Sequence, residues 1–176
     1  MTTSPAAELI ARSKGLRADA RNTNYAGGNT SAKGTVADPV TGEPVELMWV
    51  KGSGGDLGTL TESGLAVLRL DRMRSLVNVY PGLDREDEMV AAFDYCLHGK
   101  GGAAPSIDTA MHGLVDAAHV DHLHPDRERI RESGVGRPAV VVLRRGERCV
   151  HRPRRARHHG RPARCRRATR ACGAAP

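Results

Sequence analysis

Two histidines near the middle of the chain, His122 and His124, are spaced as a pair of metal ligands would be. Their segment predicts a β-strand, and alternate side chains of a strand point to the same side. Two imidazoles directed at one point form half of a zinc site, because zinc in proteins usually takes four ligands. The competing interpretation is a polar strand with two solvated histidines, so the surrounding residues must decide.

An acidic residue lies upstream, where it could act beside such a metal. The pattern predicts a helix that begins at Pro105 and Ser106. On that helix Asp108 and His112 share a face, because residues four apart are neighbours on a helix surface. A carboxylate next to a divalent cation can act as a general acid or base. Residues 105–126 therefore contain both the candidate catalytic group and the candidate ligands.

Two glycine-rich loops could bind an anion. The first covers residues 23–31 (TNYAGGNTS), and the second places Ser53 between Gly52 and Gly54. Glycine lets the backbone approach a ligand closely, and free backbone N–H groups can cradle a phosphate. Taken alone, each loop is better explained by an ordinary turn. Two such loops at strand ends in one short domain predict the two sides of one anion site, to which Lys51 either adds charge or is merely solvated.

The elements that must position these residues follow from hydrophobic periodicity. Apolar stripes predict helices over residues 5–21 and 84–98, with Asp84 as the N-cap of the second, and a short helical turn over 72–79. Strands are predicted over 32–37, 44–50 and 65–70, the first two joined as a hairpin by DPVTGE. The length of 176 residues is that of one domain.

Charge is distributed unevenly along the chain. The net formal charge is +7, but the 16 arginines and three acids from residue 127 onward give +13, which leaves −6 for the first 126 residues. We therefore expect a folded part over residues 1–126 and an Arg-rich, low-complexity tail over 127–176. One further strand is predicted at 139–143, and from Arg144 on the composition predicts disorder, because it contains few side chains able to build a core.

Cysteine usage and targeting signals favour a cytoplasmic protein. Three of the four cysteines lie in the tail and only Cys96 in the folded part, which is not a disulfide framework. We expect no signal peptide, because no basic flank precedes a long apolar run. The longest apolar run, at about residues 138–143, is too short to cross a membrane.

Four motifs in order, GGNTS, VKGSGGDL, PSIDTAMH and HVDHLHPD, resemble the class II aldolase/adducin family over residues 5–126. The resemblance is strongest to the aldolase part of bifunctional rhamnulose-1-phosphate aldolase/alcohol dehydrogenases. It implies an α/β/α sandwich, homo-oligomers, and a divalent metal, usually Zn²⁺, held by three histidines. Two of these map onto His122 and His124. The substrate phosphate would contact Gly28, Asn29, Thr30, Ser53, Gly54 and Ser106.

The resemblance also implies a reaction, the reversible cleavage of a ketose 1-phosphate such as L-rhamnulose 1-phosphate. The products would be dihydroxyacetone phosphate and L-lactaldehyde, with the metal as Lewis acid and a carboxylate moving the proton. The family's carboxylate is usually Glu, whereas Asp108 stands at this position and is one methylene shorter.

One family feature is missing from the sequence. The third histidine follows an apolar strand further downstream in the family, and the HHG at residues 158–160 lies in an arginine-rich context without such a strand. We therefore expect an incomplete site with little aldolase activity. An arginine-rich composition also arises when a GC-rich gene is read out of frame, so a frame-shifted or truncated aldolase is expected.

Two other classes of function stay open. A non-enzymatic, adducin-like binding module would be expected to lack metal ligands, which the two histidines contradict. A nucleic-acid-binding protein could use the arginines of the tail on phosphate backbones, but that segment has no aromatic residue for base stacking. Any binding to nucleic acid is therefore expected to be non-specific and sensitive to salt.

Overall fold

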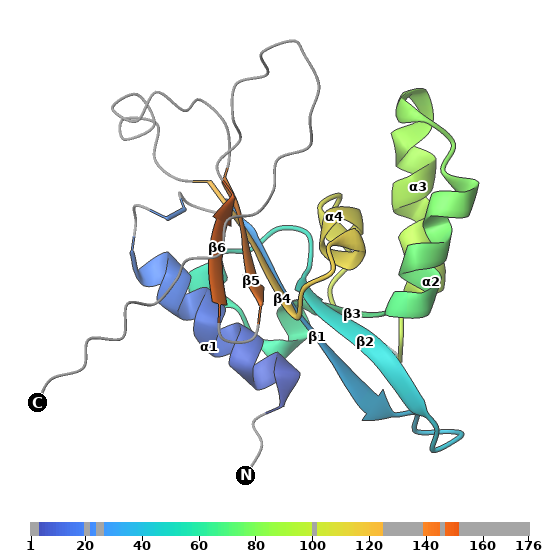
Figure 1. Ribbon diagram of the computed structural model, residues 1–176, viewed down its shortest axis with the longest axis horizontal. Coiled ribbons are helices and arrows are strands. Elements are labelled where there is room, and N and C mark those ends of the chain that lie inside the picture. The colour runs from blue at the N-terminus through green and yellow to red at the C-terminus, as the bar shows by residue number, and fades with distance from the viewer. Residues whose placement is uncertain are drawn as a thin grey trace, which may run out of the picture.

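The computed structural model describes residues 4–19, 22–23, 27–99, 102–124, 139–144 and 147–151. The described residues form one antiparallel six-stranded sheet in the order β3-β2-β1-β4-β5-β6 (Figure 1). Its strands are β1 (Asn29–Ala37), β2 (Pro44–Lys51), β3 (Leu65–Arg69), β4 (His119–Leu123), β5 (Ala139–Arg144) and β6 (Glu147–His151).

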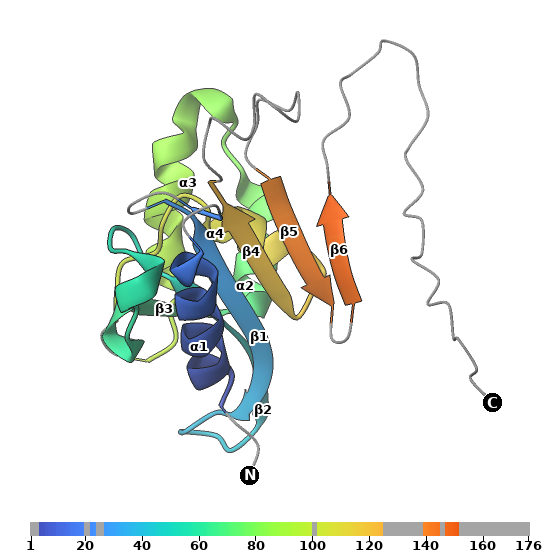
Figure 2. The same ribbon diagram turned by 90° about the vertical axis from the view of Figure 1, so that its left-hand side faces the viewer.

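Helices cover both faces of this sheet, which confirms the predicted α/β/α arrangement. Helix α1 (Pro5–Ala18) lies on one face, and α2 (Leu70–Ser75), α3 (Glu86–Ala92) and α4 (Thr109–Leu114) lie on the other (Figure 2). Each strand of β1 to β4 thus presents alternate side chains to two different helical layers. The helical layer that a strand residue faces decides which other side chains it can contact.

Helix α1 begins at a side-chain cap and ends three residues before the predicted limit of residue 21. The Ser4 hydroxyl accepts a hydrogen bond from the backbone N–H of Ala7 at 3.2 Å, and Pro5 occupies the first turn. Leu9 is completely buried and belongs to a cluster with Ala32, Leu60 and Leu65. This cluster fixes α1 against the β1–β2 face of the sheet.

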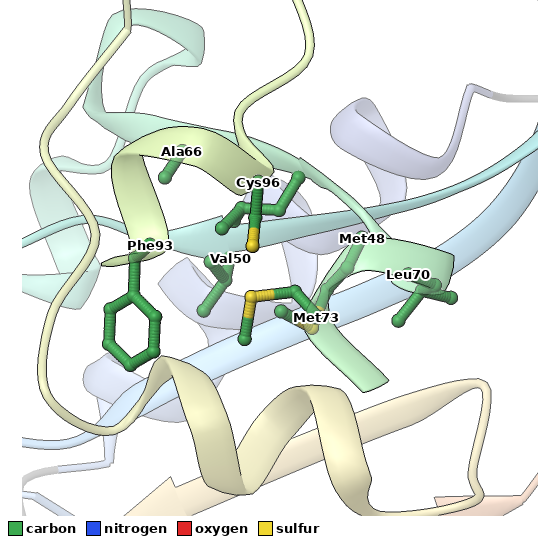
Figure 3. Packing of buried hydrophobic residues seen from close by; sticks show 8 residues of the cluster. Met48, Val50, Ala66, Leu70, Met73, Phe93 and Cys96 are labelled. Carbon is green, nitrogen blue, oxygen red and sulfur yellow. The ribbon is translucent and has the colours of Figure 1, made fainter. Parts of the chain in front are cut away.

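The larger hydrophobic cluster lies on the opposite face of the sheet. Met48 and Val50 of β2 pack there against Met73 of α2 and against Phe93 and Cys96 (Figure 3). All five are at most 2% exposed. This cluster anchors the α2–α3 layer, next to which α4 and the candidate site lie.

The helix predicted over residues 84–98 is interrupted. Helix α3 is flanked by two 3-10 turns, Leu83–Arg85 and Phe93–Cys96, so Asp84 is part of a turn and not the N-cap. Leu97 forms a bridge with Leu68 of β3. The chain must leave the helix to reach that strand, which the apolar periodicity alone does not reveal.

Other boundaries moved by a few residues. Leu70 starts α2 and does not end the preceding strand, and the turn predicted over 72–79 becomes α2 followed by a 3-10 turn at Leu76–Val79. Strand β1 begins at Asn29 and not at residue 32, because Asn29 already pairs with His122 of β4. This longer strand brings the first glycine-rich loop to the histidine pair.

The sheet continues beyond residue 126, which was the expected end of the folded part. Strand β5 matches the strand predicted at 139–143 and pairs with β4, and β6 pairs with β5. Strand β6 falls in the stretch that was predicted to be disordered, so the expected tail contains at least one additional strand. The predictions for residues 127–138 and 152–176, including the HHG segment, lie outside the described residues.

Within the described part of the chain, no helix has the length and apolar character needed to cross a membrane.

Candidate functional site

The two histidines predicted as metal ligands lie together. The Nε2 atoms of His122 in β4 and His124 just after it are 3.2 Å apart. Two nitrogens bound to one tetrahedral zinc ion at the usual bond length would be about 3.3 Å apart. Burial lowers the pKa of His124, which favours the neutral imidazole that a metal requires. The pair therefore fits two positions of a divalent-cation site.

The candidate catalytic carboxylate faces the other nitrogen of His122. Asp108 Oδ1 lies 3.5 Å from His122 Nδ1, which is a close contact but not a hydrogen bond, because the buried Nδ1 has no hydrogen-bond partner among the described residues. The pKa of Asp108 is lowered, mainly by its contact with the imidazole of His122, so the carboxylate is ionised near neutral pH. An anion near Nδ1 favours a proton on that nitrogen, which leaves Nε2 unprotonated and able to bind a cation.

Helix α4 starts later than the sequence predicted. Residues 107–108 form a turn and the helix begins at Thr109, so Asp108 is its N-cap and Ser106 precedes it. Asp108 is therefore held at the helix entrance, with its carbonyl accepting from the N–H of His112 at 3.2 Å. This position, and not a helix face, directs the carboxylate toward β4.

The first glycine-rich loop reaches the site through Asn29. The Asn29 side-chain N–H donates to the Ser106 hydroxyl at 2.7 Å, and its carbonyl oxygen accepts from the backbone N–H of Thr30 at 2.8 Å. Gly28 has a φ of 82°, and a Cβ there would lie 2.9 Å from the carbonyl oxygen of His122. Only glycine permits this close passage of the loop beside the histidine strand.

The second glycine-rich loop contacts the same segment. The backbone N–H of Ser53 donates to the carbonyl of Ala104 at 2.8 Å, two residues before Ser106. Gly54 has a φ of 72°, a conformation that favours glycine. Both loops thus contact the short stretch that precedes α4.

Lys51 is not solvated, which was one of the two roles that the sequence suggested. Its side chain is buried, and its ammonium donates to the carbonyls of Gly52 at 3.3 Å and Gly54 at 2.8 Å. Burial lowers its pKa, while the charges of Asp108 and Asp56 oppose that shift. The lysine therefore holds the loop from beneath and places a positive charge near the site.

Thr30 does not join the other candidate phosphate-binding residues. Its side chain is completely buried and its hydroxyl is 2.7 Å from the hydroxyl of Ser13 in α1. Because neighbouring strand residues face opposite sides, Asn29 faces α4 while Thr30 faces α1. The sequence motif grouped them by adjacency, whereas the pleat of β1 separates their side chains.

No group of three or more His, Cys, Asp or Glu side chains with metal-binding geometry occurs among the described residues.

The contact between His112 and Ser31 was not predicted from the sequence. His112 is completely buried, and its Nδ1 lies 2.8 Å from the Ser31 hydroxyl on β1. The four-residue spacing from Asp108 identified His112 as a neighbour of the site, but nothing in the sequence indicated that it faces β1.

Comparisons with known proteins agree with this arrangement. Residues 7–129 match the family described as "Class II Aldolase and Adducin N-terminal domain", and the chain belongs to that family. Over 119 residues it is 40% identical to "Uncharacterized oxidoreductase YuxG" of Bacillus subtilis (strain 168), an alignment that covers 68% of this chain and 17% of that protein.

A solved structure shows the same fold. The N-terminal class II aldolase domain of a conserved protein from Thermoplasma acidophilum has a TM-score of 0.62 and 27% sequence identity, covering 72% of this chain and 57% of that one. The family supports a metal-dependent, aldolase-like function. The chain spans less than a fifth of the length of the oxidoreductase relative. The activity of that whole protein is therefore not assigned to this chain.

Proposed function

We propose that this chain carries the substrate site of a divalent-metal-dependent aldolase that cleaves a ketose 1-phosphate such as L-rhamnulose 1-phosphate. The observation that carries the proposal is the convergence of Asp108, the histidine pair and Asn29 with Ser106 on one side of β1 and β4. The histidine pair favours the enzymatic branch of the family over a binding module. Alignment of the chain with 17% of a protein named as an oxidoreductase supports the idea that such a domain is joined to a dehydrogenase.

In this proposal each group has one task. His122 and His124 would hold a cation such as Zn²⁺ through Nε2, and when bound it would supply Lewis-acid stabilisation of charge at the substrate's ketone oxygen. Ionised Asp108 accepts the proton from the carbon that forms the new bond during synthesis, and returns it to that carbon during cleavage. Asn29 and Ser106 donate hydrogen bonds to the substrate phosphate, together with the backbone of the second glycine-rich loop.

We also propose that this chain holds the cation weakly, because two histidines supply fewer protein ligands than the three usual in a catalytic zinc site. Cleavage by the 176-residue chain is then slow, and the shorter reach of Asp108 relative to glutamate slows it further. The family suggests an oligomer and a sugar-phosphate substrate.

Zinc titration by calorimetry tests the metal site. The wild-type chain is compared with a His122→Ala, His124→Ala double variant, and with a His158→Ala, His159→Ala variant as the matched control outside the described residues. We expect the first variant to lose at least tenfold in zinc affinity and the control to be unchanged. Equal affinities for the wild type and the first variant would overturn the metal site.

Binding and cleavage of the sugar phosphate test the rest. Dihydroxyacetone phosphate should bind the wild type more tightly than an Asn29→Ala variant, and the small zinc-dependent release of dihydroxyacetone phosphate from L-rhamnulose 1-phosphate should disappear in Asp108→Asn. Turnover that persists in Asp108→Asn would remove the carboxylate from the mechanism. Dihydroxyacetone phosphate binding that ignores Asn29 would place the anion elsewhere.

A further inference from the structure

The α4 segment is tied to the sheet by a row of three residues on β1, Asn29, Ser31 and Lys33. We call these three residues the β1 row. They alternate along the strand and therefore face the same side. Asn29 bonds Ser106 before the helix, and the ammonium of Lys33 donates to the carbonyl of Val115 at its end. The middle member, Ser31, reaches the interior of the helix at His112.

The His112–Ser31 contact is the buried one. His112 is completely buried, and its Nδ1 is 2.8 Å from the Ser31 hydroxyl. Burial lowers the pKa of His112 to about 3, so the ring is neutral and carries one proton at ordinary pH. A neutral ring with a single fixed partner sets one orientation of α4 on the strand.

Ser31 is itself held from the opposite side of the sheet. Its carbonyl accepts a hydrogen bond from Arg12 of α1 at 2.6 Å, and the same guanidinium pairs with buried Asp121 of β4 at 3.1 Å. The strand carrying Ser31 and the strand carrying His122 are thus joined by pairing and by this ion pair. The Ser31 hydroxyl is a fixed point relative to the histidine strand.

From this geometry we infer that His112 is a positioning residue, which through Ser31 holds Asp108 against Nδ1 of His122. His112 lies one helical turn after Asp108, and its N–H donates to the Asp108 carbonyl. Rotation of α4 about its axis would move the carboxylate away from His122, because the two groups are already 3.5 Å apart and any further separation breaks the contact. The role of His122 as a ligand comes from the proposed function, on which this inference rests.

The consequence is a defined tautomer of His122. With Asp108 in place, the inferred position of the ring proton is Nδ1, so that Nε2 is unprotonated and can accept a hydrogen bond from Nε2 of His124. Without the carboxylate, the ring loses that preference and both tautomers become populated. Groups in contact with a ligand in this way change metal affinity by about tenfold to a hundredfold in metal sites generally.

Nitrogen NMR of the imidazole rings in the full-length, metal-free chain tests this inference, with His122 assigned from a His122→Gln variant. The variants are Ser31→Ala and His112→Leu, which remove the contact, and His112→Asn, whose amide takes the place of Nδ1 and can still bond Ser31. His98→Leu is the matched control, since His98 lies beside β3, where its backbone N–H donates to the carbonyl of Val67. Thermal unfolding of each variant records whether it folds.

We expect one tautomer of His122 in the wild type, His112→Asn and the control, and a mixture in Ser31→Ala and His112→Leu, with zinc affinity lower by about tenfold in the latter two. Variants that fold but keep the wild-type tautomer would overturn the inference, as would His112→Asn behaving like His112→Leu. If Ser31→Ala and His112→Leu both fail to fold, the role is purely structural and the inference is wrong. A wild type with the single tautomer but no zinc binding would refute the proposed function and leave the positioning role intact.

Discussion

At the scale of single residues, the site depends on groups that burial keeps in one charge state. His112 is the clearest case, because its ring is completely buried and its pKa is lowered to about 3. The same physical cause lowers the pKa of His124, whereas Asp108 is kept ionised by His122. Charge in this site is therefore set by surroundings that the residue types alone do not specify.

We predict that acid destabilises the fold through His112. An unfolded histidine has a pKa near 6.5, so between about pH 6.5 and 3 the unfolded chain binds more protons than the folded one. Stability from this group is complete above pH 6.5 and falls with pH by up to about 1.4 kcal/mol per unit. Urea unfolding at pH 7, 6 and 5 should show this slope.

Two variants identify the source of the slope. In His112→Asn the slope should be shallower, because that side chain does not titrate. His124→Gln removes a group shifted in the same direction but less buried, and should change the slope less. A slope that is the same in His112→Asn and the wild type would show that His112 is not responsible.

At the scale of elements, the second glycine-rich loop packs closely against the segment before α4, and this packing would position the proposed anion site. A Cβ on Gly52 would lie 2.2 Å from Cβ of Ala103 and 2.9 Å from the Ala104 carbonyl oxygen. The loop and the segment before α4 are thus in backbone contact. Any side chain at Gly52 must push them apart.

We predict that Gly52→Ala destabilises the fold by about 1–3 kcal/mol, as overpacking usually does. It should also weaken dihydroxyacetone phosphate binding, because Ser53 moves away from Ser106. The matched control is Gly15→Ala, which lies in α1 with no heavy atom within 4 Å of the new Cβ and should stabilise by up to about 1 kcal/mol. Chemical denaturation of both variants checks the opposite signs, and a neutral Gly52→Ala would contradict the packing.

At the scale of the whole molecule, the sheet depends on strands outside the motif-bearing part. Strand β4 carries His122, is followed directly by His124, and pairs with β1 on one side and β5 on the other. If β5 and β6 are absent, the edge of β4 is exposed, and open edges of apolar strands associate. We therefore expect the fold to depend on residues beyond the expected boundary at 126.

We predict different outcomes for two shortened chains. A chain ending at residue 151 should keep the wild-type melting temperature, because residues 152–176 contain no large apolar side chain to bury. A chain ending at residue 126 should melt at least several degrees lower and sediment as larger species. Equal stability of the 126-residue chain would show that β5 and β6 contribute nothing, and loss of stability at residue 151 would assign a folding role to the remainder.

The sequence by itself determined the parts that depend on local pattern. Alternation along a strand was enough to bring His122 and His124 to one point, and the glycine pairs were enough to predict tight loops. Four ordered motifs were enough to predict the family, and the match of that family over residues 7–129 confirms it. In each case the physical cause acts over a few residues, so residues close together in the sequence are enough to predict the result.

Only the tertiary structure decided which of those groups meet. Thr30 is adjacent to Asn29 in sequence but is turned toward α1, and the ring of His112 meets Ser31, 81 residues away. Pairing and packing likewise set the start of α4 at Thr109 and formed strand β6, which was not predicted from the sequence. These outcomes depend on strand register and on which face of the sheet each helix covers, and contacts between distant segments fix both.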